Sequence, residues 1–281
     1  SGWRLGVLGV ALVVALPVLT VFAFFLQPAT EAWQHLVQTA LHDYVINSLL
    51  LMLGVAAGTL LLGVSTAWVS ATCEFPGRRV FEWALLLPMA IPAYIIAYTY
   101  TGLLDFAGPV QGALRELFGW GYGDYWFPNV RSLPGAMVML SLVLYPYVYL
   151  LARAAFLEQS VCVLEVSRTL GATPMHTFVR VALPMARPAI VAGLLLALME
   201  TLADYGTVQY FGVSTFTTGI FRTWFGLGDA VAAAQLSALL MSFVFVLILL
   251  ERWSRRHARY HETGARMKSL PRHRLEGWRM A

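Results

Sequence analysis

Long apolar runs recur along the chain and are separated by short polar segments. A helix that crosses the hydrocarbon core of a bilayer needs about 20 apolar residues, because each residue adds about 1.5 Å. Six runs reach this length: Leu5–Leu26, Tyr44–Ala71, Phe81–Leu104, Leu133–Phe156, Pro188–Phe211 and Ala230–Leu250. The pattern therefore predicts an all-α membrane protein with six transmembrane helices.

Prolines lie within several of these runs, and those in the third and fourth are the most informative. Pro88 and Pro92 lie in the third, and Pro146 lies in the fourth. Proline removes a backbone donor and tends to kink a helix, and membranes tolerate such breaks where neighbouring groups satisfy the freed carbonyls. We expect bent helices at these positions.

Composition agrees with a membrane environment. The 281 residues are 59% hydrophobic and 12% charged, whereas an average soluble domain has about 25% charged residues. The chain has a single lysine, Lys268, which no glycine-rich turn precedes. A phosphate-binding P-loop is therefore absent from the sequence, and ATP-driven transport would need a separate subunit to bind the nucleotide.

The cationic residues are distributed unevenly between the two sets of loops. Of 19 lysines and arginines, three lie in the loops after the first, third and fifth runs, namely Arg115, Arg131 and Arg222. Cytoplasmic loops of membrane proteins are enriched in these residues. The bias predicts a multi-pass membrane protein with both termini in the cytoplasm.

Several other classes of protein fit poorly. The histidines all lie outside the apolar runs, and the sequence has no H-E-x-x-H or Gly-x-Ser-x-Gly pattern, so an intramembrane enzyme is not expected. Cys73 and Cys162 have no partner at metal-ligand spacing, so we predict no metal site. A secondary transporter is the alternative class, but it predicts inverted repeats that this sequence lacks.

Two loops on the predicted outer side have distinct character. Glu31–Asp43 mixes polar and apolar residues and suits a short interfacial helix. Asp105–Ser132 is longer and contains Trp120, Tyr125 and Trp126 among glycines. Such aromatic residues favour the membrane–water boundary. The longer loop is interpreted either as a surface for an external partner or as an aromatic belt.

The cytoplasmic segment between the fourth and fifth runs predicts two short helices. Ser160–Leu170 has helical spacing, and Gly171 suits a C-terminal cap with positive φ. Thr173 and Pro174 then suit an N-cap followed by proline in the first helical position. We expect a helix, a glycine turn and a second helix lying across the cytoplasmic face.

This segment resembles the "EAA" coupling loop of ABC importer permeases. Glu165, Gly171, Val181, Leu183 and Pro184 fall at the spacing of that motif, while Val166-Ser167 replaces the usual pair of alanines. The resemblance implies a type I ABC importer permease fold with a cytoplasmic coupling helix. It also implies a set of residues that dock on the ATPase: Glu165, Ser167, Arg168, Gly171, Ala172, Pro174, Leu183 and Pro184.

The same resemblance implies a location in the bacterial plasma (inner) membrane, a set of partners and an organisation of the chain. The partners are a cytoplasmic ATPase dimer that binds ATP and Mg, an external substrate-binding protein and a second permease half. No cofactor, catalytic residue or nucleic acid is expected for this chain. We predict a first helix with its external segment in 1–43, a permease core in 44–251 with the coupling loop at 157–187, and a basic tail or linker in 252–281.

A finer resemblance concerns the cargo. Ile91–Tyr98, Met199–Gly206 and Thr217–Trp224 are similar to ferric-iron importer permeases, most closely to the first of their two fused halves. Thiamine, polyamine and phosphonate importers are related alternatives. Charges at membrane depth usually face a cavity or a partner. We therefore expect a polar path lined by four residues, although the acids could instead bond to neighbouring helices: Tyr94, Tyr98, Glu200 and Asp204.

Overall fold

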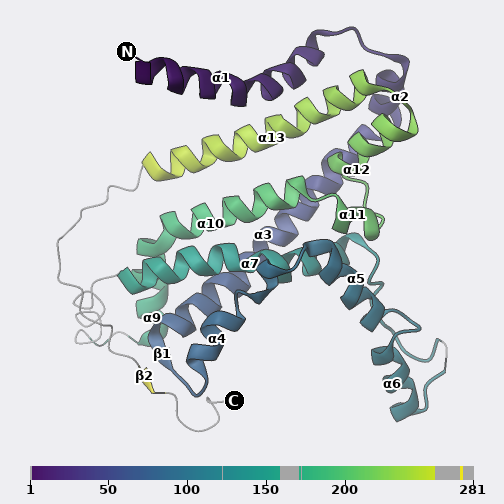
Figure 1. Cartoon of the computed structure of the whole chain (residues 1–281). Helices are drawn as coiled ribbons and strands as arrows, with labels where there is room; N and C mark the ends of the chain where they lie inside the picture. Colours follow the sequence, from purple (N-terminus) through teal and green to yellow (C-terminus); the bar gives the residue numbers. More distant parts are fainter. Residues whose placement is uncertain (1, 122, 159–170, 172, 257–272, 275–281) are drawn as a thin grey trace.

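The computed structural model describes the chain except residues 1, 122, 159–170, 172, 257–272 and 275–281 (Figure 1). The longer helices are α1 (Gly2–Ala23), α2 (Glu31–Thr39), α3 (Leu41–Thr72), α5 (Ala93–Leu104), α6 (Pro109–Phe118), α7 (Leu133–Glu158), α10 (Leu183–Ala203) and α13 (Ala230–Arg256). The shorter helices are α4 (Arg78–Ala84), α9 (Pro174–Thr177), α11 (Gly206–Tyr210) and α12 (Phe216–Phe221). Two 3-10 turns (Phe24–Leu26 and Leu87–Ala90), two π-helical turns (Phe178–Ala182 and Arg222–Gly226) and a parallel pair of strands, β1 (Cys73–Glu74) and β2 (His273–Arg274), complete the described structure.

The predicted number of spans is confirmed. Within the described residues, five helices are long and apolar enough to cross a membrane, and a sixth span is formed by a bent pair of helices. The first, second, fourth and sixth predicted runs each correspond to one continuous helix, and α7 continues through Pro146. The predicted interfacial helix is α2, where the Thr30 hydroxyl accepts a hydrogen bond from Trp33 N at 3.2 Å.

The centre of the bundle is formed by α3, α7 and α10 (Figure 1). Glycines let these helices approach closely, because a side chain at Gly63 or Gly193 would collide with α7 around Val148. One apolar cluster joins Leu51 and Val55 of α3 to Leu140 and other residues of α7. These contacts fix α7 as the central helix, on which the remaining elements pack.

The third predicted span is bent beside its prolines, as expected, and the bend divides it into two helical segments. Arg78–Ala90 and Ala93–Phe118 meet at a bend of 100°. The break lies at Ile91 and Pro92, where Ile91 is extended (φ −118°, ψ 129°). Proline has no amide hydrogen and disfavours helical backbone in the residue before it, so Pro92 ends the first segment at this point.

The fifth predicted span is shifted toward the N-terminus. The apolar helical stretch is Met175–Ala203, not Pro188–Phe211. At its start, the π-helical turn Phe178–Ala182 leads into α10, whose first turn contains Pro184. At its end, Asp204 leaves the helix with an extended backbone (φ −67°, ψ 127°). The hydrophobic pattern continues past Asp204 because α11 packs in the same core, so apolar content alone misplaced the boundary.

Candidate functional site

A cavity of about 280 Å³ lies where α5, α7 and α10 meet, beside the break in the third span. Ala93 is the first residue of α5, while Leu140 and Leu144 belong to the N-terminal half of α7. The C-terminal end of α10 contributes the polar side of the cavity. The lining residues are Ala93, Leu140, Leu144, Glu200, Ala203, Asp204 and Tyr205.

The two acids predicted to line a path both border this cavity, but they do not share a helix face. Asp204 lies just past the end of α10, and its carboxylate accepts hydrogen bonds from Val208 N at 3.1 Å and Thr207 Oγ1 at 3.0 Å. Its backbone carbonyl accepts a third bond from Thr217 Oγ1 at 2.7 Å. Asp204 therefore organises the turn between α10 and α11, a role that the spacing of the two acids did not reveal.

Glu200 is in a different position. It lies on the last turn of α10 and is exposed, and the described part of the chain offers its carboxylate no hydrogen bond or ion pair. A carboxylate at the wall of a cavity and without a partner is free to interact with a solute. Of the two acids, Glu200 is the one available for chemistry in the cavity.

The two predicted tyrosines lie next to the cavity and are not among its lining residues. Tyr94 packs against Gly206, where an added Cβ would lie 3.0 Å from the Tyr94 Cβ. Tyr98 makes an edge-to-face contact with Tyr210, with ring centroids 5.7 Å apart. Both tyrosines are more than half exposed. They therefore form the contact between α5 and α11, on a face that this chain leaves open.

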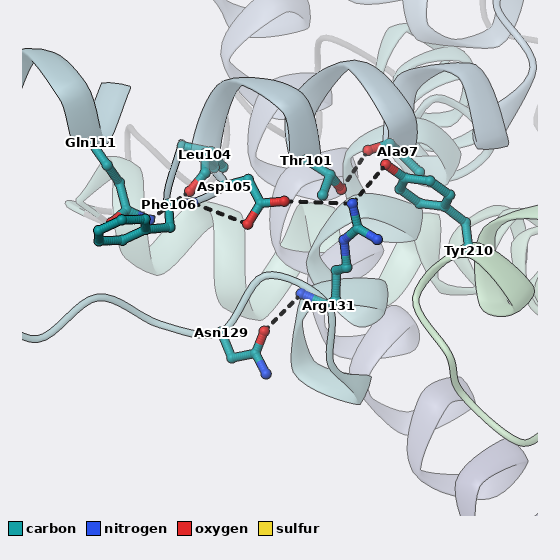
Figure 2. Close-up of polar contacts among 9 residues, drawn as sticks. All are labelled: Ala97, Thr101, Leu104, Asp105, Phe106, Gln111, Asn129, Arg131 and Tyr210. Atoms are coloured by element: carbon teal, nitrogen blue, oxygen red, sulfur yellow. Dashed lines mark hydrogen bonds and ion pairs between the residues drawn. The ribbon is translucent and has the colours of Figure 1, made fainter. Parts of the chain in front are cut away.

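An ionic cluster at the C-terminal end of α5 was not predicted, and this end of the broken span is called outer below because the distribution of arginines predicts that it faces away from the cytoplasm. Arg131 lies 3.5 Å from the Asp105 carboxylate and 3.5 Å from the Tyr210 hydroxyl (Figure 2). The Arg131 guanidinium also lies over the Tyr210 ring, 5.0 Å from its centroid. Asn129 accepts a hydrogen bond from the Arg131 backbone amide at 3.1 Å. The cluster joins the end of α5 to α11 and to the segment before α7.

A second ionic cluster, at the opposite end of that span, was also missed. Glu82 Oε1 is 2.8 Å from Arg78 and 3.0 Å from Arg153, and Arg78 Nε donates to the Ser70 carbonyl at 2.8 Å. The i,i+4 spacing of Arg78 and Glu82 was a local signal for their pair. Nothing in the local sequence connected Glu82 with Arg153, because these residues are 71 positions apart.

The predicted ATPase-docking segment is described only from Gly171 onward. Gly171 has φ +82°, and Thr173 Oγ1 accepts a hydrogen bond from His176 N at 3.3 Å at the start of α9. The positive-φ glycine and the Thr-Pro helix start are thus confirmed. Leu183 and Pro184 begin α10. The remaining predicted docking residues, Glu165, Ser167, Arg168 and Ala172, lie outside the described residues.

The described residues contain no group of three or more histidine, cysteine or acidic side chains that could hold a metal ion. Cys73 is a partly buried free thiol 3.7 Å from the Thr72 hydroxyl, and Cys162 lies outside the described residues. Glu200 and Asp204 alone could contact a cation only transiently, because stable metal sites need more ligands.

Known proteins give this geometry a context. The family described as "Binding-protein-dependent transport system inner membrane component" matches residues 59–260. The chain is 27% identical over 256 residues to "Fe(3+)-transport system permease protein FbpB 2" of Haemophilus influenzae, covering 89% of this chain and 46% of that protein. It is 24% identical over 203 residues to "Molybdenum transport system permease protein ModB" of Escherichia coli, covering 70% of this chain and 86% of the relative.

Solved structures share the fold at lower identity. A chain of a bacterial alginate ABC transporter, in complex with a pentasaccharide-bound periplasmic protein, superposes with a TM-score of 0.70 at 18% identity, covering 92% of this chain and 96% of that one. A chain of the MetNI methionine ABC transporter in an inward-facing conformation gives 0.61 at 20% identity, covering 82% and 100%. The family match spans most of the chain and includes the cavity, the broken span and the coupling segment. The chain is therefore a multi-pass inner-membrane protein of the binding-protein-dependent transport system inner membrane component family, which comprises the permeases of ABC importers.

Proposed function

We propose that this permease carries a cation across the membrane through the cavity beside Glu200, and that ferric iron is the cargo. The observation that carries the proposal is the unpartnered Glu200 carboxylate at the wall of the 280 Å³ cavity, with the Asp204 carboxylate beside it. Carboxylate oxygens are hard donors, which suit hard cations. With only two acids there, a cation would be held weakly enough to leave again.

The charge of the cavity favours some of the cargoes named for the relatives over others, because some are cations and others are anions. Its described lining residues include two acids and no cationic side chain. Molybdate and sulfate are anions, and like charges repel strongly in a medium of low dielectric. The similarity to the ferric-iron permease also extends over 89% of this chain, compared with 70% for the molybdenum permease. A polyamine or thiamine carries positive charge and is the second candidate, whereas the negative charge of a phosphonate fits less well.

The remaining parts of the machinery would come from partners. The cytoplasmic segment 157–187 would dock on an ATPase dimer that binds ATP and Mg, and an external binding protein would deliver the cargo. A second permease half, either fused, paralogous or identical, would cover the open face around Tyr94 and Tyr98. The chain spans about half the length of its ferric-iron relative, which leaves room there for such a half. In this arrangement both termini face the cytoplasm, as the distribution of arginines suggests.

Transport would follow from alternating access. A loaded binding protein docks on the outer side, and ATP closes the ATPase dimer. The dimer moves the coupling segment, and with it α7 and α10, which adjoin the segment on either side. The cavity then opens outward to receive the cargo, and ATP hydrolysis resets the permease.

The proposal is tested by measuring the uptake of radiolabelled ferric iron. The native gene is deleted, and the cells are complemented with either the intact gene or one of three variants. Glu200→Gln removes the free carboxylate at constant size, and we expect uptake to fall by at least about tenfold, because a charge-assisted contact contributes about 1.5–3 kcal/mol. Gly171→Pro disrupts the positive-φ turn of the coupling segment and should abolish uptake. Asp43→Asn removes an exposed carboxylate at the start of α3, outside the cavity lining and the docking segment, and should have no effect.

The outcomes identify which part of the proposal fails. If Glu200→Gln imports iron at the normal rate, the cavity assignment is wrong. If deletion of the gene leaves iron uptake unchanged, iron is excluded, and labelled thiamine, a polyamine and a phosphonate are tested in the same cells. Molybdate uptake that depends on this gene would contradict the argument from charge.

A further inference from the structure

The two halves of the broken span are attached to the bundle in different ways. The inner half consists of α4 and the turn Leu87–Ala90, and it is held by directional polar contacts. Glu82 pairs with Arg153 of α7 at 3.0 Å, and the Tyr145 hydroxyl of α7 donates to the Leu85 carbonyl at 2.8 Å. Tyr145 and Arg153 are eight residues apart, about 12 Å along the helix axis. The inner half is therefore fastened to α7 at two separate points.

Glu82 also connects the inner half to α3. It pairs with Arg78, whose Nε donates to the Ser70 carbonyl at the end of α3. The three charged side chains are between 10% and 26% exposed. Partly buried ion pairs are screened less than surface pairs and lose more when one partner is removed. The inner half, α3 and α7 are thus linked by one network, in which Glu82 contacts both arginines and Arg78 contacts α3.

The outer half, α5, is held mainly by apolar and aromatic contacts. Ala97 is fully buried in the cluster that contains Leu140 and Leu144 of α7. On the other side, Tyr94 packs on Gly206 and Tyr98 packs on Tyr210. Apolar packing is not directional, so these surfaces can move past one another without leaving a buried polar group unpaired. The polar contacts of the outer cluster lie beyond the end of α5 and are half exposed.

The break between the halves lies at the cavity. Ile91 and Pro92 interrupt the helix, and Ala93, the next residue, lines the cavity together with Glu200. A rotation of α5 about this point would change the size of the cavity opening. The same rotation would separate Tyr94 from Gly206.

We propose that Glu82 and Tyr145 are positioning residues that make the inner half of the broken span move with α7, so that the outer half pivots at Ile91–Pro92 and opens the cavity. The inference rests on the proposed function, since it takes the ATPase as the source of the movement of α7. In this proposal the two halves of one span move separately, the inner half with α7 and the outer half about the break. It also gives Glu82, which lies outside the cavity, a role in transport.

A pair of cysteines at the α5–α11 contact tests the pivot. Tyr94→Cys and Gly206→Cys would place two Cβ atoms about 3.0 Å apart, close enough for a disulfide to form with a small adjustment. Cys73 and Cys162 are first replaced by serine. The permease is reconstituted in vesicles with its ATPase, and the rate of disulfide formation is measured without nucleotide and with a non-hydrolysable ATP analogue. We expect the analogue to slow the reaction by at least about fivefold, the lower end of typical allosteric coupling.

A matched pair provides the control. Gly54→Cys and Met137→Cys join α3 to α7, and their Cβ atoms would also lie about 3.0 Å apart. Because α3 and α7 belong to the same body in this proposal, the nucleotide should not change the rate of disulfide formation at this pair. If the nucleotide does not change the rate of disulfide formation at Tyr94–Gly206, the proposed pivot of α5 is wrong. If the rate of disulfide formation changes equally at both pairs, the proposed location of the pivot is wrong.

The role of Glu82 is tested in the same system with Glu82→Gln, and Glu116→Gln, at an exposed position on α6, serves as the charge-matched control. We expect Glu82→Gln to remove the nucleotide dependence at Tyr94–Gly206 while ATP hydrolysis by the complex continues. Tyr145→Phe deletes one hydroxyl and gives a milder version of the same result if Glu82→Gln fails to assemble. Full nucleotide dependence in both variants would rule out the positioning role.

The crosslinking assay does not depend on the cargo. If wild-type vesicles do not import iron but the Tyr94–Gly206 reaction responds to nucleotide, the pivot stands and the cargo assignment fails. If iron is imported and the reaction does not respond, the cargo assignment stands and the pivot fails.

Discussion

The ionic clusters at the two ends of the broken span are built from the same kinds of side chain but differ in their surroundings. At the inner end, the Glu82 contacts are 2.8 and 3.0 Å long, and the three side chains are mostly shielded from solvent. At the outer end, Arg131 and Asp105 are 3.5 Å apart and each is 52% exposed. Exposed pairs contribute little because water competes and salt screens them. The comparison indicates that the inner cluster fixes the helices, whereas the outer cluster only limits their movement.

The largest expected effect is that of Glu82→Ala. It leaves two arginine side chains beside each other without their shared carboxylate, so we expect a loss of about 2–4 kcal/mol in the free energy of unfolding. Equilibrium unfolding of the purified permease in mixed micelles measures this loss. Glu158→Ala should change stability by less than about 0.5 kcal/mol. Equal effects of the two variants would remove the distinction between the inner cluster and ordinary surface charge.

Tyr145→Phe should have an intermediate effect. The substitution removes the donor to the Leu85 carbonyl and keeps the ring, which belongs to an apolar cluster around α7. Loss of a single hydrogen bond costs about 1 kcal/mol. The same unfolding assay applies. Combined with Glu82→Ala in a double-mutant cycle, it shows whether the two fastenings of the inner half act together or independently.

Asp105→Asn should have a smaller effect. The Asp105–Arg131 pair is long and solvated, and Arg131 keeps its contact with the Tyr210 ring. We expect a change in the free energy of unfolding of less than about 0.7 kcal/mol, which high salt reduces further. A loss as large as that from Glu82→Ala would show that both ends of the span are equally rigid.

The smallest effect concerns a second acid on the same side as Asp105, and this acid is half-buried. Asp229 precedes α13. Partial burial by itself raises the pKa of Asp229, but hydrogen bonds from Ala232 N (2.9 Å), Thr30 and Val231 outweigh this and lower the pKa below its ordinary value of 3.8. A lowered pKa means that Asp229 stabilises the fold fully above about pH 4, and that this contribution is lost as pH falls through the folded-state pKa.

The measurement is the stability difference between wild type and Asp229→Asn from pH 6 to pH 3. We expect less than about 0.5 kcal/mol at pH 6, because asparagine caps a helix about as well as aspartate, declining toward zero at the acid end. A difference that stays constant over this range would show that the charge of Asp229 has no part in capping α13.

Hydrophobic pattern and local chemistry were enough to predict much of the molecule. The number of spans follows from apolar length, and the bend at Pro92 and the positive φ of Gly171 follow from the properties of single residue types. The EAA-like spacing predicted the family, and the match over residues 59–260 confirms it. These features are local, so a short stretch of sequence contains the information that specifies them.

The features that the sequence did not reveal depend on contacts between segments that are distant in the sequence, or on which neighbouring groups bind a given side chain. Arg153 was counted only as part of a charge bias, although it is a partner of Glu82 across 71 residues. Glu200 and Asp204 looked equivalent at i,i+4, yet Asp204 is bound by Thr207 and Val208, while Glu200 has no such partner among the described residues. Whether a helix continues past an acid depends on such tertiary partners, which periodicity does not encode.

The spans become less apolar as they become more buried, and this order bears on how the chain is made. Among the five continuous spans of the described residues, α1 is the most apolar and its apolar stretch is not buried at all, whereas α7 is the least apolar and the most buried. α1 packs against α13, which leaves the ribosome more than 200 residues later (Figure 1). During synthesis α1 must remain in lipid without this neighbour, and its composition allows it to do so. α7 follows α3, on which it packs, and can enter the membrane against a surface that is already in place.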